Sequence, residues 1–159
     1  SNRSTGKQAS NARTGSGRRA MILADSGFWI ALGSRRDRHH HAAREAAQRY
    51  AREGFVSTWP VLTEVTQLLV ARVGMHQALE FMESIAQGAC LIPTPPDDAL
   101  ARASFLMRRY QDLPMDLADA SLVILAEQLG EGRILSTDLR DFSGYRWKNT
   151  RPFTNLLLP

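Results

Sequence analysis

MILADSGFWIALG, residues 21–33, places a short apolar run and a carboxylate directly before a second apolar segment that ends in glycine. The run at 21–25 predicts a buried strand, and residues 26–33 predict a short helix that Gly33 closes. A strand followed at once by a helix is typical of a parallel sheet with helices on its faces. In such a sheet Asp25 lies at the carboxyl end of its strand.

The rest of the chain repeats this alternation of short strands and longer helices. We expect strands at 55–59, 89–93 and 133–137, and an edge strand at 142–147. We expect helices at about 38–53, 60–73, 75–87, 95–110 and 114–130, several of them bounded by Gly or opened by Pro. The pattern predicts an α/β fold with a parallel sheet and helices on both faces.

The basic charge of the chain is concentrated at one end. Of 20 basic residues, five lie in residues 1–20, which contain no acid and are mostly Ser, Gly, Asn and Arg. We expect this segment to be a flexible basic arm, and residues 21–159 to be a single domain. That domain has 15 basic and 16 acidic residues. A case for nucleic-acid binding must therefore rest on local arrangement and not on overall charge.

Composition excludes several classes of protein. A single cysteine, Cys90, excludes a disulfide framework and a cysteine-rich zinc module. No apolar stretch approaches the roughly 18 residues of a membrane-spanning helix, and the first residues lack the apolar run of a secretory signal. We expect a cytoplasmic protein with no membrane association.

Acidic residues recur where the predicted strands end. Asp25 and Asp138 directly follow strands, Glu64 lies one turn into the helix after 55–59, and Asp116 and Asp119 open another helix. Because the carboxyl ends of parallel strands share one edge, these five acids are expected to converge. Each has an ordinary alternative, since Asp often caps a helix and Asp116 with Asp119 has the spacing of a capping box. Glu64 borders an apolar helix stripe, where a carboxylate is either solvated or held for a purpose.

Clustered carboxylates repel one another, and a divalent cation relieves that repulsion. Oxygen-only ligands favour Mg²⁺ or Mn²⁺, which suit phosphodiester hydrolysis. No protein nucleophile is evident, and three consecutive histidines, 39–41, have poor spacing for a metal site. A phosphoaspartate receiver is excluded because it needs a Lys near the end of a late strand, and the only Lys in residues 21–159 is Lys148, in the last segment. A haloacid-type phosphatase is excluded because it needs Asp where Gly27 stands.

Four segments, in order, carry a resemblance to a known family: MILADSGFWIAL, STWPVLTEV, PMDLADASLVILAEQLG and ILSTDLRDF. Together they span nearly all of residues 21–159, and the set is similar to the PIN domain family, in particular to VapC-like toxin ribonucleases. The resemblance implies that the four acids are Asp25, Glu64, Asp119 and Asp138, with Asp116 in support. Asp141 competes for the fourth place, and we prefer Asp138 because it directly follows the strand.

The resemblance implies a three-layer α/β/α sandwich around a mostly parallel sheet of four or five strands. It also implies a Mg²⁺- or Mn²⁺-dependent endoribonuclease that hydrolyses RNA as the toxin of a type II toxin–antitoxin pair, with an antitoxin partner and a homodimeric state. Thr137 and Arg140 are expected to contact phosphate. The alternative is a catalytically inactive PIN-like module that binds nucleic acid or protein.

Overall fold

The computed structural model describes residues 20–159, and it confirms the predicted α/β fold. Residues 1–19 of the predicted arm lie outside the described residues. The elements are β1 (Ile22–Ala24), α1 (Ser26–Gly33), α2 (His40–Arg49), β2 (Phe55–Val56), α3 (Trp59–Arg72), α4 (Met75–Ala86), α5 (Ala99–Arg109), α6 (Leu117–Leu129), β3 (Arg133–Leu135), α7 (Leu139–Gly144), β4 (Arg146–Trp147), β5 (Arg151–Pro152) and β6 (Thr154–Asn155).

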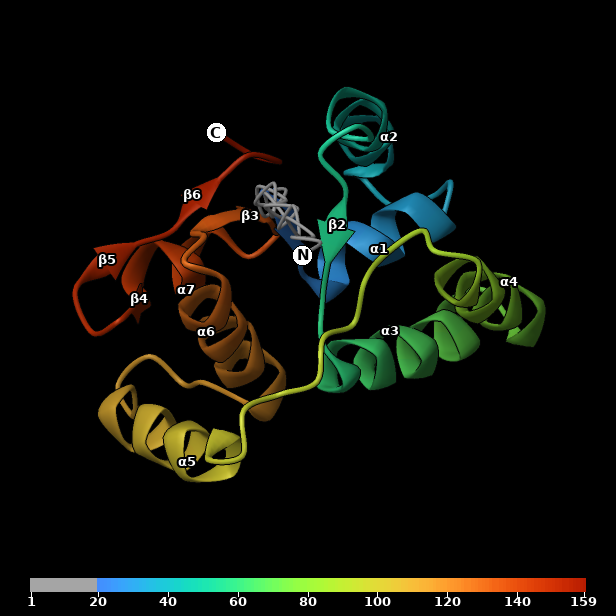
Figure 1. The fold of residues 1–159 in the computed structure, drawn as a ribbon. Coiled ribbons are helices and arrows are strands. Elements are labelled where there is room, and N and C mark those ends of the chain that lie inside the picture. Colours follow the sequence, from blue (N-terminus) through green and yellow to red (C-terminus); the bar gives the residue numbers. More distant parts are fainter. Residues whose placement is uncertain (1–19) are drawn as a thin grey trace, which may run out of the picture.

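The main sheet has four strands in the order β2-β1-β3-β6, and every neighbouring pair is parallel. Leu23 of β1 pairs with Val56 on one side and with Ile134 on the other, so the first strand of the chain becomes a central strand. Figure 1 shows the sheet between helices, with α6 and α7 on one side and α1 on the other. The parallel order brings the carboxyl ends of β1, β2 and β3 to one edge.

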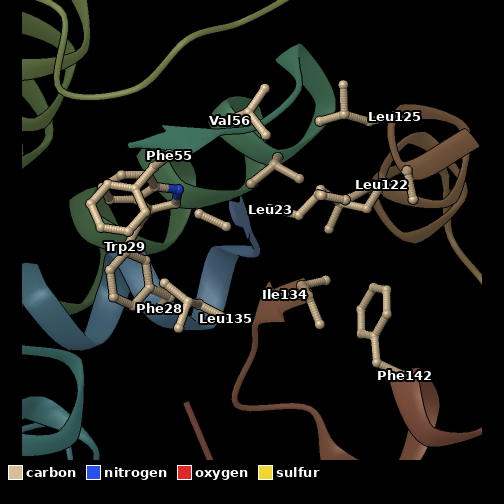
Figure 2. Packing of buried hydrophobic residues seen from close by; sticks show 14 of the residues in the cluster. Leu23, Phe28, Trp29, Phe55, Val56, Leu122, Leu125, Ile134, Leu135 and Phe142 are labelled. Carbon is tan, nitrogen blue, oxygen red and sulfur yellow. The ribbon is translucent and has the colours of Figure 1, made fainter. Parts of the chain in front are cut away.

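Period-two alternation along the strands divides the core between the two sheet faces. Leu23, Val56 and Ile134 share a face because they are paired in register. Figure 2 shows this face against Leu122 and Leu125 of α6, whereas Phe55 and Leu135 lie with the aromatic rings of α1. Ring centroids of Phe28 and Trp29 stand 5.0 Å apart. Burial of both faces explains why β1 and β2 are apolar throughout.

Helix α3 packs beside the sheet against the neighbouring helices α1, α4 and α6. Val61, Val65 and Leu69 lie on one stripe of α3 and are buried, as the sequence periodicity indicates. Thr58 caps this helix, since its hydroxyl accepts a hydrogen bond from the Val61 N–H at 3.4 Å.

In residues 20–159, no helix combines the length and the hydropathy that crossing a bilayer requires.

Two predicted strands are wrong. The segment 89–93 makes only an isolated bridge, in which Leu91 bonds to Phe55 and to Ser57, because prolines at 93, 95 and 96 remove the donors that a longer ladder needs. In the segment 142–147, residues 142–144 end helix α7 and only Arg146–Trp147 form a strand, β4. Asp138 accounts for the helix: its side chain accepts a hydrogen bond from the Asp141 N–H at 3.0 Å and starts a helical turn.

Candidate active site

A pocket of about 480 Å³ opens at the carboxyl edge of the sheet. All five predicted acids line this pocket, although more than 110 positions separate the first from the last. Two further acids join them, Asp37 from the loop before α2 and Asp141 from α7. The complete set of acidic lining residues is Asp25, Asp37, Glu64, Asp116, Asp119, Asp138 and Asp141. The structure therefore brings together the carboxylates that the sequence spreads over four segments.

Asp25 is the innermost acid, with 6% of its surface exposed. It follows β1, and its backbone N–H still bonds to the Leu135 carbonyl of β3 at 3.0 Å. One carboxylate oxygen accepts from the Ser26 N–H at 2.7 Å and so caps α1, and the other accepts from the Ser136 hydroxyl at 2.8 Å. Both oxygens are thereby fixed by hydrogen bonds that favour the charged form.

Glu64 reaches the pocket from the second turn of α3. The Ser26 hydroxyl donates to Oε1 of Glu64 at 2.8 Å, while it stands 3.4 Å from Oδ1 of Asp25. A hydroxyl has one proton, so the shorter contact is the hydrogen bond that ties α3 to the start of α1. Of the two alternatives for Glu64, solvated edge or held carboxylate, the structure supports the second.

The remaining predicted acids act as helix caps. Asp116 and Asp119 form a capping box at the start of α6, in which the Asp119 N–H bonds to Asp116 Oδ1 at 2.8 Å and the Asp116 N–H bonds to Asp119 Oδ2 at 3.2 Å. Asp138 caps α7 through Asp141. The capping interpretation is therefore confirmed for these acids, and it coexists with their position in one pocket.

Burial and crowding raise the pKa values of several of these acids. Burial raises the pKa of Asp25 to about 6, and the charges of Glu64 and Asp138 add to the effect. Burial, followed by the neighbouring Asp116, raises the pKa of Asp119 to about 8. Burial and Asp138 raise the pKa of Asp141 to about 6. The raised pKa values show that charging these acids together is unfavourable, which is the electrostatic situation that a bound cation relieves.

Sequence reasoning missed several residues of this site. Asp37 and Arg72 line the pocket, and the hydroxyls of Ser26 and Ser136 hold its acids. A usable signal exists for the serines, because each adjoins the end of a strand next to a predicted acid. Asp37 and Arg72 give no such signal, since a polar turn and a helix end are ordinary places for charge.

The two predicted phosphate contacts differ in position. Thr137 lines the pocket, whereas Arg140 is exposed on α7 and is not part of the pocket lining. Thr137 also packs against Gly27 so closely that a side chain at Gly27 would collide with its hydroxyl. Only glycine therefore allows the start of α1 to approach the loop after β3.

The donor set fits a hard divalent cation by residue type, because every acid that lines the pocket offers carboxylate oxygen. Over residues 20–159, no three His, Cys, Asp or Glu side chains are arranged so that they could hold an ion as they stand. The hydrogen bonds described above give the physical reason: Asp116, Asp119 and Asp138 point oxygens at backbone N–H groups.

Comparison with known proteins gives consistent matches. No protein-family model matches the chain. Ribonuclease VapC26 of Mycobacterium tuberculosis (strain ATCC 25618 / H37Rv) is 28% identical over 125 residues, which cover 79% of this chain and 92% of that protein. The crystal structure of VapC20 from Mycobacterium tuberculosis, described as a Sarcin-Ricin loop cleaving toxin, superposes with a TM-score of 0.68 at 21% identity, over 82% of this chain and 99% of that one. VapBC2 from Rickettsia felis, crystallised with a DNA fragment from its promoter, gives a TM-score of 0.61 at 11% identity, over 85% and 98% of the two chains.

The chain has the α/β fold of the solved VapC20 structure, with a four-stranded parallel sheet and an acidic pocket at its carboxyl edge. Its sequence is similar to that of a VapC ribonuclease, and in fold and sequence it resembles the VapC group of PIN-type proteins.

The raised pKa of Asp25 predicts how the metal-free protein responds to pH. Between about pH 4 and pH 6 the folded protein retains a proton on Asp25 that the unfolded chain has released, so the free energy of unfolding falls as pH rises. In Asp25→Asn this loss is absent, so the free energy of unfolding of the variant rises relative to that of the parent by up to about 3 kcal/mol between pH 4 and pH 7. Urea unfolding in EDTA at intervals of one pH unit measures the difference.

Asp112→Asn is the matched control, because Asp112 is exposed and lies outside the pocket lining. Its unfolding free energy should run parallel to that of the parent across the same range. A constant offset between Asp25→Asn and the parent would show that Asp25 does not titrate above its ordinary pKa.

Proposed function

We propose that this protein is a Mg²⁺- or Mn²⁺-dependent endoribonuclease that acts in the cytoplasm as the toxin of a type II toxin–antitoxin pair. The observation that carries the proposal is the convergence of Asp25, Glu64, Asp119 and Asp138, with Asp116 beside them, in one pocket at the carboxyl edge of the sheet. Similarity to Ribonuclease VapC26 along 92% of its length supports the same class of activity.

The proposed ion ligands are Asp25, Glu64, Asp119 and Asp138, with Asp116 in support. When bound, the ion would lower the pKa of a water molecule and stabilise negative charge on the phosphate undergoing hydrolysis. Asp25 is already fixed by Ser26 and Ser136, so it would provide a rigid anchor. Asp119 and Asp138 would turn from their capping positions toward the ion, which costs each helix part of a cap.

Asp138 remains the preferred fourth acid over Asp141. The Ser136 hydroxyl accepts from the Asp138 N–H at 3.0 Å and donates to Asp25, so one group links the backbone of Asp138 to the innermost acid. Asp141 has no such link to Asp25 and lies one turn further, within α7. We assign Asp141 to the rim of the pocket.

Binding of RNA must overcome the negative charge of the pocket. Thr137 in the lining and Arg140 on α7 are proposed to contact the phosphate backbone, and Arg72 is a further cation within the lining. These residues do not select a base sequence, because phosphate contacts carry no sequence information. The alternative of an inactive PIN-like module keeps the fold and the binding surface but has no metal-dependent turnover.

Metal-dependent cleavage tests the proposal directly. With mixed single-stranded RNAs and Mg²⁺ or Mn²⁺, the parent should cleave internal phosphodiester bonds, and EDTA should stop the reaction. Asp25→Asn and Asp119→Asn should each lower the rate by about 100-fold or more. The same ions should raise the melting temperature of the parent by mass action and raise it less in the two variants.

Asp112→Asn again serves as the control and should cleave at the parental rate. Absence of cleavage together with a normal metal-induced rise in melting temperature would favour the inactive module. Equal metal-induced shifts in the parent, Asp25→Asn and Asp119→Asn would contradict the proposed ligand set. Cleavage of DNA or of phosphomonoesters in preference to RNA would contradict the substrate class.

We also propose that residues 21–159 form the nuclease domain and that the basic residues of 1–20 lie outside its working site. Removal of residues 1–20 should leave the metal-dependent cleavage rate unchanged while it weakens salt-sensitive RNA binding, since the arm holds five of the 20 basic residues. Gel-shift measurements at two salt concentrations and the cleavage assay report the two effects separately. A truncated protein that is folded but inactive would assign the arm to the working site.

An antitoxin partner is part of the proposal, and a second groove supports it. The groove has a volume of about 740 Å³ and lies between α1, α2, α3 and α4. Its apolar lining residues are Trp29, Leu32, Phe55, Leu69 and Phe81. The charged residues Arg35, Arg44 and Glu80 lie among them. Such a surface suits a peptide segment that presents apolar side chains together with acceptor groups.

Trp29 provides the specific feature of this groove. It is 94% buried, and its Nε1 is the one buried side-chain nitrogen or oxygen without a hydrogen-bond partner in the part of the chain that the structure describes. A buried donor without an acceptor costs stability. Because this nitrogen is buried in the free chain, a partner's carbonyl or carboxylate oxygen would reach it only after the Trp29 side chain turned toward the groove.

Trp29→Phe tests this contact because it removes the N–H and retains an aromatic ring. Affinity for the product of the neighbouring reading frame, measured by titration with the purified partner, should fall by about tenfold, the effect of one lost hydrogen bond. Trp59→Phe is the control, since Trp59 is 68% exposed and lies outside this groove. Unchanged affinity of a folded Trp29→Phe variant would exclude the indole as a contact.

We further propose a homodimer. Two exposed apolar side chains, Leu100 of α5 and Leu117 of α6, line a smaller cleft of about 230 Å³ and supply surface for the dimer.

A further inference from the structure

At the end of β6, the Asn155 side chain continues the hydrogen-bond ladder of the main sheet. The backbone ladder between β3 and β6 stops where the Leu156 N–H bonds to the Ile134 carbonyl at 2.8 Å. Beyond that point the Asn155 side chain pairs with the backbone of Ser136: its Nδ2 donates to the Ser136 carbonyl at 2.9 Å, and its Oδ1 accepts from the Ser136 N–H at 3.3 Å. The same Oδ1 accepts from the Leu157 N–H at 3.0 Å. One amide group therefore fixes both backbone polar groups of Ser136.

Ser136 is fully buried and stands between two acids of the pocket. Its hydroxyl accepts from the Asp138 N–H at 3.0 Å and donates to Asp25 Oδ2 at 2.8 Å. A backbone N–H can only donate, so the hydroxyl proton must be directed at Asp25. The position of Ser136 consequently sets the distance between the Asp25 carboxylate and the backbone of Asp138.

We propose that Asn155 is a positioning residue for the acidic pocket, acting through Ser136 on Asp25 and Asp138. This inference rests on the proposed function, in which these two acids hold a divalent ion. Asn155 is not part of the pocket lining and contacts none of its acids directly. Its influence therefore passes through the pair of hydrogen bonds to the Ser136 backbone.

The chemistry of this contact requires asparagine. The side chain must offer a donor and an acceptor on two separate atoms of one planar amide group, one methylene from the backbone, and among the natural residues only Asn does so. Asp has the same shape, but it would place a carboxylate oxygen against the Ser136 carbonyl. Ala would leave both polar groups of Ser136 without this partner, and buried backbone groups are rarely left so.

The test measures Mn²⁺ affinity by electron paramagnetic resonance in the full chain, with folding checked by near-ultraviolet circular dichroism. Asn155→Asp and Asn155→Ala should each raise the Mn²⁺ dissociation constant by about tenfold, as expected when the partner that orients a ligand is lost. Thr154→Ala is the matched control, because Thr154 lies on the same two-residue strand, is exposed and keeps its backbone ladder. Its dissociation constant should stay at the parental value.

Ser136→Ala and the double variant Ser136→Ala/Asn155→Ala show whether the effect passes through Ser136. If it does, the double variant should bind Mn²⁺ no more weakly than Ser136→Ala alone. Full additivity of the two effects would overturn the inference. So would a parental dissociation constant in either folded Asn155 variant.

Nuclear magnetic resonance of the metal-free protein separates this inference from the proposed function. Asn155→Asp should shift the Asp138 amide and the Asp25 carboxyl carbon, and Thr154→Ala should not. If the parent fails to bind Mn²⁺ while these resonances shift, the proposed function fails and the positioning role stands. If the resonances do not move in a folded Asn155→Asp variant, the positioning role is wrong whatever the metal affinity.

Discussion

The buried carboxylate of Asp25 is the constraint to which the rest of the site is fitted. It stands at the end of the central strand, where burial raises its pKa and every neighbouring acid adds to the cost of its charge. Two donors offset that cost, the N–H of Ser26 at the start of α1 and the hydroxyl of Ser136 beyond β3. Ser26 adjoins Asp25 in the chain, whereas Ser136 lies 111 positions away, so the second donor reaches Asp25 only when β1 and β3 pair in the sheet.

Stability and the candidate chemistry use the same carboxylates. Asp25, Asp116 and Asp138 each cap a helix, and Asp119 completes the capping box of α6. A cap fixes an oxygen at a helix N-terminus, and in a parallel α/β fold these N-termini gather at the carboxyl edge of the sheet. Helix capping therefore places these acids at the carboxyl edge of the sheet. The same arrangement means that drawing Asp119 or Asp138 toward an ion competes with the start of α6 or α7.

Helix α1 lines both the acidic pocket and the apolar groove. Its first turn carries Ser26 and Gly27 into the acidic pocket, and its later residues Trp29 and Leu32 line the apolar groove. The eight residues of α1 thus line two environments of different character. A peptide bound in the groove would contact the same helix that carries Ser26 and Gly27 into the pocket.

Much of the fold can be predicted from the sequence, because its signals are local. The helix over 26–33, the caps at Asp116 and Asp138, and the apolar strand around Leu23 follow from spacing and composition. The convergence of the five acids follows from one topological rule about parallel strands. The continuous strands predicted at 89–93 and 142–147 do not form, because prolines without an N–H donor and the Asp138 cap outweigh apolar character.

Other features depend on contacts between distant segments, and only the tertiary structure decided them. No sequence pattern predicts which partners these groups find: that Asn155 pairs with Ser136, that the Ser26 hydroxyl bonds to Glu64, or that the Trp29 indole has none. Asparagine near the end of a chain, serine after a strand and tryptophan in a helix are common in every fold. What these residues do depends on which backbone group stands opposite, and that is fixed by the order β2-β1-β3-β6 and its register. The sequence by itself determined where charge and apolar surface occur, and the packing of the strands determined which of those groups touch.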